Sequence, residues 1–193
     1  MNVGIVGLGL IGGSMARSIK QKAEDRVLGF DIDQETLDMA IMCRAVDAVL
    51  DDDSIPSCSL ILLAVRPGAA VDWVREKAGL ISTDAVVIDL CGIKRKVVSE
   101  ITPVAEKYGF SYIGGHPMAG KEVNGFENSS ADLFSGASMI LTPDRHTSLP
   151  LLEKLKKFFI GIGFARLTFT TPEDHDRIIA YTSQLAHISS SAY

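Results

Sequence analysis

The chain has 193 residues, of which 47% are hydrophobic and 22% are charged. These proportions are typical of a globular domain with a sizeable core, and they exclude a collagen-like repeat, a coiled-coil rod and a disordered tail. The 19 Lys and Arg against 24 Asp and Glu give a formal net charge of −5 without a basic run, so neither nucleic acid nor a membrane is expected as a partner.

The apolar pattern alternates short continuous runs with longer stretches of helical spacing, which is typical of strand, crossover helix and strand. Strands are predicted at residues 3–6, 27–31, 60–65, 85–90, 111–114, 138–141 and 164–169, and helices at about 10–22, 34–42, 69–80, 94–107 and 148–160. Strands that are apolar on both faces suit a parallel sheet with helices on either side. We therefore expect an α/β fold with a Rossmann-like, doubly wound and mostly parallel sheet.

A glycine-rich turn follows the first predicted strand and opens the first helix. Its sequence is Gly7-Leu8-Gly9-Leu10-Ile11-Gly12. In such a motif the first glycine permits a tight turn, the second lets backbone approach a pyrophosphate, and the third lets the helix pack closely on the strand. Asp31 ends the second strand, where a carboxylate accepts hydrogen bonds from ribose hydroxyls and repels a 2′-phosphate. The expected cofactor is therefore NAD rather than NADP.

Ligands of an open parallel sheet bind beyond the carboxyl ends of the strands, so the residues just after each strand are candidates for a site. Arg66 follows the strand at 60–65 and is expected to contact the cofactor. His116 follows the strand at 111–114, and among these residues it alone titrates near neutral pH. A neutral imidazole held there is a candidate base for alcohol oxidation, and the competing interpretation is a histidine that caps a strand end.

A last helix is predicted from Pro172 to the end of the chain, with Thr171 as its N-cap. Its apolar positions recur near helical spacing, and no later segment of this sequence would cover them. These positions are Ile178, Leu185, Ile188 and Ala192. We expect residues 1–170 to form a dinucleotide-binding domain and 171–193 to begin a truncated helical domain for substrate binding and dimerisation. A homodimer through this helix is the expected assembly.

Three blocks of the sequence resemble the prephenate and arogenate dehydrogenases of tyrosine biosynthesis. They are the glycine motif, the block Gly115-His116-Pro117-Met118-Ala119-Gly120-Lys121-Glu122, and Thr171 to Asp176 with Ser183 to His187. The resemblance implies a cytoplasmic enzyme for the NAD-dependent oxidative decarboxylation of prephenate to 4-hydroxyphenylpyruvate, or of arogenate to tyrosine. It also implies that His116 accepts the proton or hydrogen bond of the ring hydroxyl.

The resemblance further implies which residues lie on the substrate side. His187 would face the substrate, although Ala186 replaces the proline that usually precedes it, and Lys121 would lie near the substrate. Gly92 stands where the family's Asp-x-x-Ser-x-Lys pattern has a serine, and it brings no hydroxyl. The family's clamp for the ring carboxylate is an arginine further along the helical domain, and no residue here maps onto it.

Two other functions stay open at this point. The first is a non-catalytic or weakly active NAD-binding module, because of Gly92 and the incomplete helical domain. The second is a related dehydrogenase or imine reductase acting on another small acid. His175 is expected to belong to the start of the last helix, with a role in orienting the site as the alternative, and His146 is expected on a solvated loop.

The cysteines and histidines give no sign of a metal site. Cys43, Cys58 and Cys91 are far apart in the sequence and show no CxxC spacing. They are expected to be buried free thiols in a reducing cytosol.

Overall fold

In the computed structural model, which describes the backbone of residues 1–191 and the side chains of residues 1–181, eight strands form one sheet. The strands are β1 (Asn2–Val6), β2 (Arg26–Phe30), β3 (Ala48–Val49), β4 (Leu60–Leu63), β5 (Val86–Asp89), β6 (Ser111–Pro117), β7 (Ser138–Thr142) and β8 (Arg166–Phe169). The α-helices are α1 (Leu10–Lys22), α2 (Gln34–Met42), α3 (Pro67–Lys77), α4 (Arg95–Tyr108), α5 (Leu149–Gly161) and α6 (Pro172–Ser191).

The strand order is β3-β2-β1-β4-β5-β6-β7-β8. Every neighbouring pair is parallel except β6 and β7, which are antiparallel. The first six strands therefore end at one edge of the sheet, and the order reverses direction between β1 and β4. This is the doubly wound arrangement, and it confirms the predicted fold class.

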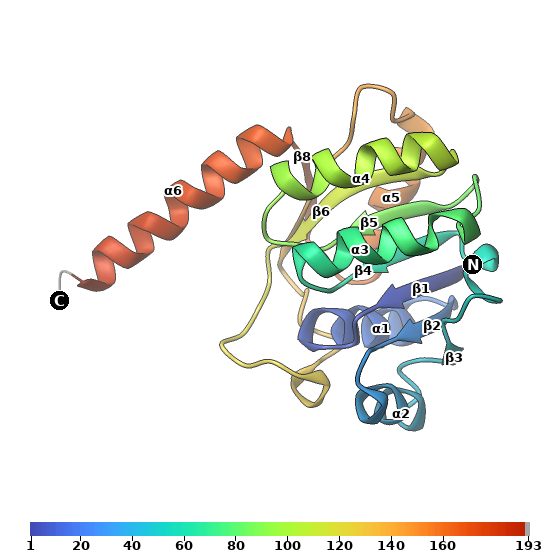
Figure 1. Ribbon diagram of the computed structural model, residues 1–193. Coiled ribbons are helices and arrows are strands. Elements are labelled where there is room, and N and C mark those ends of the chain that lie inside the picture. Colours follow the sequence, from blue (N-terminus) through green and yellow to red (C-terminus); the bar gives the residue numbers. More distant parts are fainter. Residues whose placement is uncertain (192–193) are drawn as a thin grey trace.

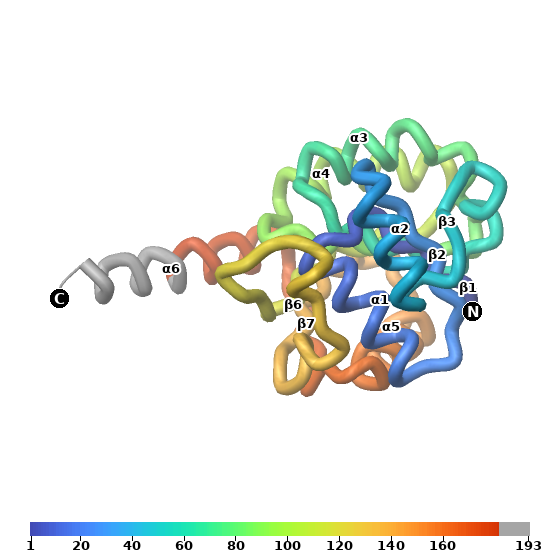
Figure 2. Tube along the Cα trace, turned by 90° about the horizontal axis from the view of Figure 1, so that it is seen from below, coloured from blue at the N-terminus to red at the C-terminus, as the bar shows by residue number. Residues whose placement is uncertain are grey.

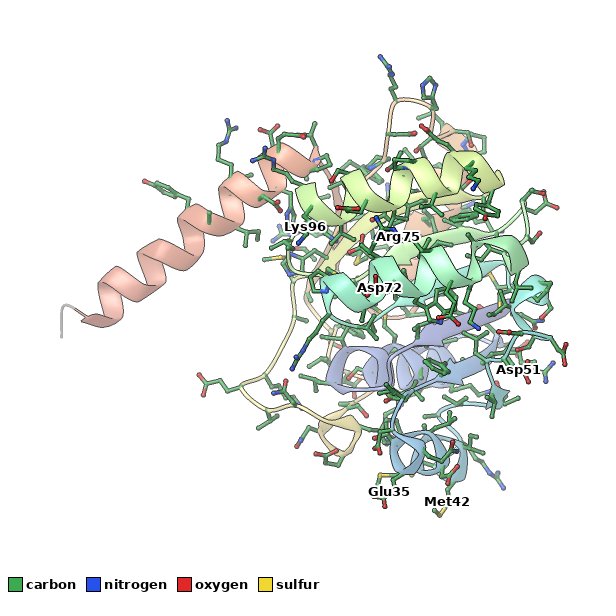
Figure 3. All side chains as sticks on the ribbon, in the orientation of Figure 1. Glu35, Met42, Asp51, Asp72, Arg75 and Lys96 are labelled. Atoms are coloured by element: carbon green, nitrogen blue, oxygen red, sulfur yellow. The ribbon has the colours of Figure 1, made fainter. Side chains whose placement is uncertain are left out.

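Helices cover both faces of the sheet (Figure 1). One apolar core joins the sheet to α1, α2 and α5, and a second joins it to α3 and α4. Figure 2, seen from below, shows α3 and α4 on the side of the sheet opposite α1 and α5. Asp72 and Arg75 of α3 and Lys96 of α4 lie on the outer surface of the α3–α4 layer (Figure 3). Arg75 forms an ion pair there with Glu100 of α4. Strands covered in this way are apolar on both faces, which explains the continuous apolar runs in the sequence.

The structure corrects two expectations. The strand predicted at 111–114 continues to Pro117, so His116 lies inside β6 and not after it. The cause is β7: Gly114 pairs with the last residue of β5, but residues 114–117 pair with β7, which carries β6 past the end of its parallel neighbour. Cys43 is exposed, whereas Cys58 and Cys91 are buried as expected.

The last helix begins where the sequence predicts it. The Thr171 hydroxyl accepts a hydrogen bond from the backbone N–H of Asp174 at 3.1 Å, which is N-cap geometry. The start of α6 lies beside α4, and the helix then points away from the sheet (Figure 1). Ile178 is exposed, while the side chains of Leu185, Ile188 and Ala192 lie outside the described residues. Among the described residues, no helix combines the length and the apolar character of a membrane span.

Candidate active site

A cleft of about 810 Å³ opens where β1, β2, β4 and β5 end. Most of the residues expected to bind cofactor or substrate line it. They are Gly7, Gly9, Leu10, Ile11, Asp31, Arg66, Gly92 and Lys121. Leu8 and Gly12 lie behind the cleft wall, because the Leu8 side chain is buried in the core and Gly12 packs against the turn. The loop after β6 closes the far side of the cleft through Ala119, Gly120 and Asn124.

Two of the three motif glycines, Gly7 and Gly12, occupy positions that a larger residue could not share. Gly7 has φ +87°, and a Cβ there would come within 2.5 Å of Val65 Cγ1. A Cβ on Gly12 would collide with the Gly7 carbonyl oxygen, so helix and turn approach as closely as backbone allows. Gly9 has no neighbour within 4 Å of such a Cβ and lines the cleft. No side chain caps the start of α1, which leaves its first N–H groups available to a phosphate.

Asp31 is fixed at the edge of the same cleft. Its carboxylate accepts hydrogen bonds from the backbone N–H of Leu8 at 2.6 Å and of Asp33 at 3.0 Å. A carboxylate has about four lone-pair sites, so acceptors remain for a ribose diol. Asp33 itself caps α2, and its hydrogen bonds with Thr36 hold the pKa of its carboxyl below the usual range. The cleft therefore fits a dinucleotide, with Asp31 toward the ribose and the α1 N-terminus toward the pyrophosphate.

The charge of Asp31 leads to a prediction about cofactor choice. NAD should bind more tightly than NADP by about tenfold or more, because a 2′-phosphate beside this carboxylate meets about 1.4 kcal/mol or more of repulsion. Thermal-shift titrations with both dinucleotides measure the difference. Asp31→Ser should narrow it, whereas Asp33→Ser, which retains a capping oxygen for α2, should leave it nearly unchanged. Stronger stabilisation of the unsubstituted chain by NADP would contradict the assignment of Asp31.

His116 is half-buried beside this cleft. Its Nδ1 lies 2.9 Å from Nε2 of His175, and the two rings meet edge to face at 5.1 Å between centroids. A Cβ built on Gly92 would lie 3.8 Å from the other ring nitrogen, Nε2. Burial, together with the nearby His175 and Lys94, lowers the pKa of His116 from 6.5 to about 4. The imidazole is therefore neutral at pH 7 and able to accept a proton.

His175 connects His116 to a carboxylate. It is 1% exposed, and its Nδ1 lies 2.8 Å from Oδ1 of Asp176. The same carboxylate accepts the backbone N–H groups of Lys94 at 2.7 Å and Arg95 at 2.9 Å, where α4 begins. Burial acts to raise the pKa of Asp176, but the hydrogen bonds from Arg95, His175 and Lys94 outweigh it and lower the pKa below the usual value. The start of α6 thus contributes to the surroundings of His116, which the sequence offered only as the alternative to a helix-start role for His175.

A buried ion pair is hydrogen-bonded to the residue directly before His116. Lys94 and Asp89 are both 0% exposed, and the ammonium donates to the carboxylate and to the Gly115 carbonyl oxygen. Tyr112 donates to the other carboxylate oxygen at 2.7 Å. This network joins the end of β5, the start of α4 and the residue before His116. Lys94 is therefore a paired interior group and not a free cation at the cleft.

The remaining candidates are distributed as follows. Lys121 is exposed on the cleft rim, and its ammonium lies 3.4 Å from the Asn128 carbonyl oxygen. Arg66 is exposed at the N-cap of α3 and lines the cleft. His146 is exposed on the loop before α5. The side chain of His187 lies outside the described residues, so its expected role as a substrate ligand stays a prediction.

The lowered pKa of His116 predicts how stability depends on pH. Between about pH 6.5 and about pH 4 the unfolded chain binds a proton that the folded imidazole does not, so the free energy of unfolding should fall as the pH is lowered through this window. Urea unfolding at several pH values measures it. His116→Asn should remove this part of the pH dependence, and an identical profile in the variant would contradict the pKa assigned to His116.

The sheet order, the glycine turn and the cleft together define a Rossmann-type nucleotide-binding domain. Residues 15–168 match the family model described as the nucleotide-binding domain of prephenate dehydrogenase. The chain belongs to the prephenate dehydrogenase family.

Known relatives extend beyond the segment that this chain matches. Cyclohexadienyl dehydrogenase of Zymomonas mobilis is 30% identical over 97% of this chain, and the chain spans 64% of that protein, which is less than two thirds of its length. Prephenate dehydrogenase from A. aeolicus, solved with hydroxyphenyl propionate and NAD⁺, superposes with a TM-score of 0.86 at 28% identity, covering 100% of this chain and 67% of that one. Synechocystis arogenate dehydrogenase gives a TM-score of 0.87 at 28% identity, with the same coverage.

Proposed function

We propose that this chain carries the NAD site and the catalytic histidine of an enzyme that oxidatively decarboxylates prephenate or arogenate. The observation that carries the proposal is His116, a neutral imidazole whose Nε2 lies beside Gly92 at the rim of the cleft. The substrates follow from the relatives, which are named as prephenate, arogenate and cyclohexadienyl dehydrogenases. In this proposal residues 1–170 are the dinucleotide-binding domain, and 171–193 begin a helical domain that completes the substrate site and the homodimer.

In the proposed reaction His116 acts as the general base for the ring hydroxyl. Bound NAD supplies the acceptor for the hydride that leaves the ring carbon bearing the hydroxyl. As that C–H bond breaks, Nε2 of His116 takes the hydroxyl proton and the C–O bond becomes a carbonyl. The bond to the ring carboxylate then breaks, its electron pair enters the ring, and carbon dioxide leaves. His116 returns its proton to the resulting phenolate oxygen, so the imidazole is neutral again for the next turnover.

The rest of the site holds the reactants in place. The amides at the start of α1 would hold the pyrophosphate of the dinucleotide. The carboxylate of Asp31 would hold its ribose. In this proposal Lys121, which is exposed on the same rim, would meet a substrate carboxylate. Cys91 lines the cleft but takes no part, because burial raises the pKa of its thiol to about 12.

A paired substrate assay tests the proposal. NADH formation is followed by absorbance with prephenate and then with arogenate, using this chain and any longer form of the gene product. Turnover of either substrate supports the proposal and identifies the preferred one. If NAD binds but neither substrate is turned over in either form, the chain is a non-catalytic binding module. Turnover restricted to another small hydroxy acid would assign it to a different dehydrogenase.

Gly92 offers a gain-of-function prediction. A Cβ here would lie 3.8 Å from Nε2 of His116 with ordinary space around it, so Gly92→Ser should bring a hydroxyl to the substrate hydroxyl. One added hydrogen bond contributes about 0.5–1.5 kcal/mol, so kcat/KM should rise by roughly two- to tenfold. Gly92→Ala controls for the added carbon and should give no such rise. A fall in kcat/KM for the serine variant would show that the substrate hydroxyl binds elsewhere.

A further inference from the structure

The contact between His116 and the start of α6 has a role beyond packing. We propose that His175, held by Asp176, is a positioning residue that keeps the proton of neutral His116 on Nδ1 and leaves Nε2 free beside the cleft. Its catalytic consequence rests on the proposed function, but the position of the proton does not.

The hydrogen bonds that run from Asp176 through His175 to His116 determine which ring nitrogen of each histidine carries a proton. The carboxylate of Asp176 only accepts, so Nδ1 of His175, 2.8 Å away, must carry a proton and donate it. A neutral His175 then has a lone pair on Nε2. That lone pair lies 2.9 Å from Nδ1 of His116, which must donate in its turn. Neutral His116 therefore has no proton on Nε2, and this is the form that a general base requires.

This arrangement of protons on the two histidines is stable because the carboxylate of Asp176 is fixed in place. Its two oxygens are held by consecutive backbone N–H groups, those of Lys94 and Arg95, at the positive end of α4. Rotation of the carboxylate would break both bonds, so its acceptors stay directed at His175. The side chain of Lys94 also donates to the carbonyl oxygen of Gly115, directly before His116. Elements α4, α6 and β6 are thus joined through hydrogen bonds around one imidazole.

The charges around His116 agree with a neutral resting state. Burial and the ammonium of Lys94 disfavour a proton on the ring, whereas the carboxylates of Asp89 and Asp176 favour it. When Nε2 accepts the substrate proton, the new positive charge lies one imidazole away from the carboxylate of Asp176. The same pair can therefore fix the tautomer before the reaction and stabilise the imidazolium during it, as a carboxylate behind a catalytic histidine does elsewhere.

Nitrogen-15 NMR of the labelled protein measures the tautomer directly. The ring nitrogens of His116 are assigned by their loss in His116→Asn, without substrate or cofactor. At pH 7 we expect a proton on Nδ1 and none on Nε2. His175→Leu removes the acceptor and should move a substantial share of the proton to Nε2, whereas His175→Gln retains an acceptor and should preserve the wild-type pattern. His146→Leu, at an exposed histidine, is the matched control and should change nothing.

Several outcomes would overturn the proposal. One is a proton on Nε2 of His116 in the unsubstituted protein, which is decisive even if His175→Leu fails to fold. Another is an unchanged tautomer in a folded His175→Leu variant, which would reduce His175 to a packing residue. In an active preparation, His175→Leu should also lower kcat by about tenfold or more at unchanged NAD affinity, whereas His175→Gln should keep most of the wild-type kcat. If the tautomer is found but no turnover occurs, the proposed function fails and the positioning role stands.

Discussion

Replacement of His116 by Asn should lower the turnover of prephenate or arogenate by roughly 10²- to 10⁴-fold, the range that loss of a general base costs. The variant keeps a polar group of similar shape beside His175 but has no basic nitrogen where Nε2 stood. Because His116 does not line the cleft that fits the dinucleotide, the affinity for NAD should stay near its normal value. A fall in kcat at constant NAD affinity is the signature of a group that acts in the transition state.

The measurement combines steady-state NADH formation with a calorimetric titration of NAD. His146→Asn, which removes an exposed histidine from the loop before α5, is the matched control and should behave like the unsubstituted chain. If turnover requires a longer form of the gene product, both variants are made in that form. A loss of less than tenfold in kcat would show that another group takes the hydroxyl proton.

Local patterns in the sequence were sufficient wherever local backbone geometry decides the structure. The glycines of the turn could be assigned because a positive φ at Gly7 and the close approach at Gly12 admit no other residue. The start of α6 could be assigned because capping is a contact between neighbours, here Thr171 and Asp174. Helices α1 and α2 have the predicted bounds for the same reason.

Contacts between distant segments were beyond such patterns. His116 and His175 are separated by 59 positions and meet only because β6 and the start of α6 lie together in the fold. The extension of β6 depends on antiparallel pairing with β7, which no local signal marks. A lysine is almost never fully buried unless it is paired. The interior position of Lys94 could therefore not be predicted without knowing that Asp89 lies beside it in the fold. The residues around the candidate base were therefore the least predictable part of the site.

The buried pair of Lys94 and Asp89 predicts the largest effect on stability. Lys94→Met should lower the free energy of unfolding by about 3–5 kcal/mol, because it leaves the Asp89 carboxylate charged and without its counterion at 0% exposure. The free energy of unfolding of a typical domain is only about 5–15 kcal/mol, so the variant should be marginally folded at 37 °C. Urea unfolding monitored by circular dichroism at pH 7 gives the difference.

Arg75→Met is the matched control, since Arg75 lies on the exposed face of α3 and α4 (Figure 3) and the substitution breaks its ion pair with Glu100. Arg75→Met should lower the free energy of unfolding by well under about 1 kcal/mol, because water screens the exposed charges. The double variant Lys94→Met with Asp89→Leu separates two causes of the loss. If the stranded charge dominates, the second substitution should restore part of the lost stability. Recovery stays incomplete, because Tyr112 and the Gly115 carbonyl oxygen also lose their partners. A single variant as stable as the control would mean that water reaches Asp89, and the rigid support assigned to β6 before His116 would then be wrong.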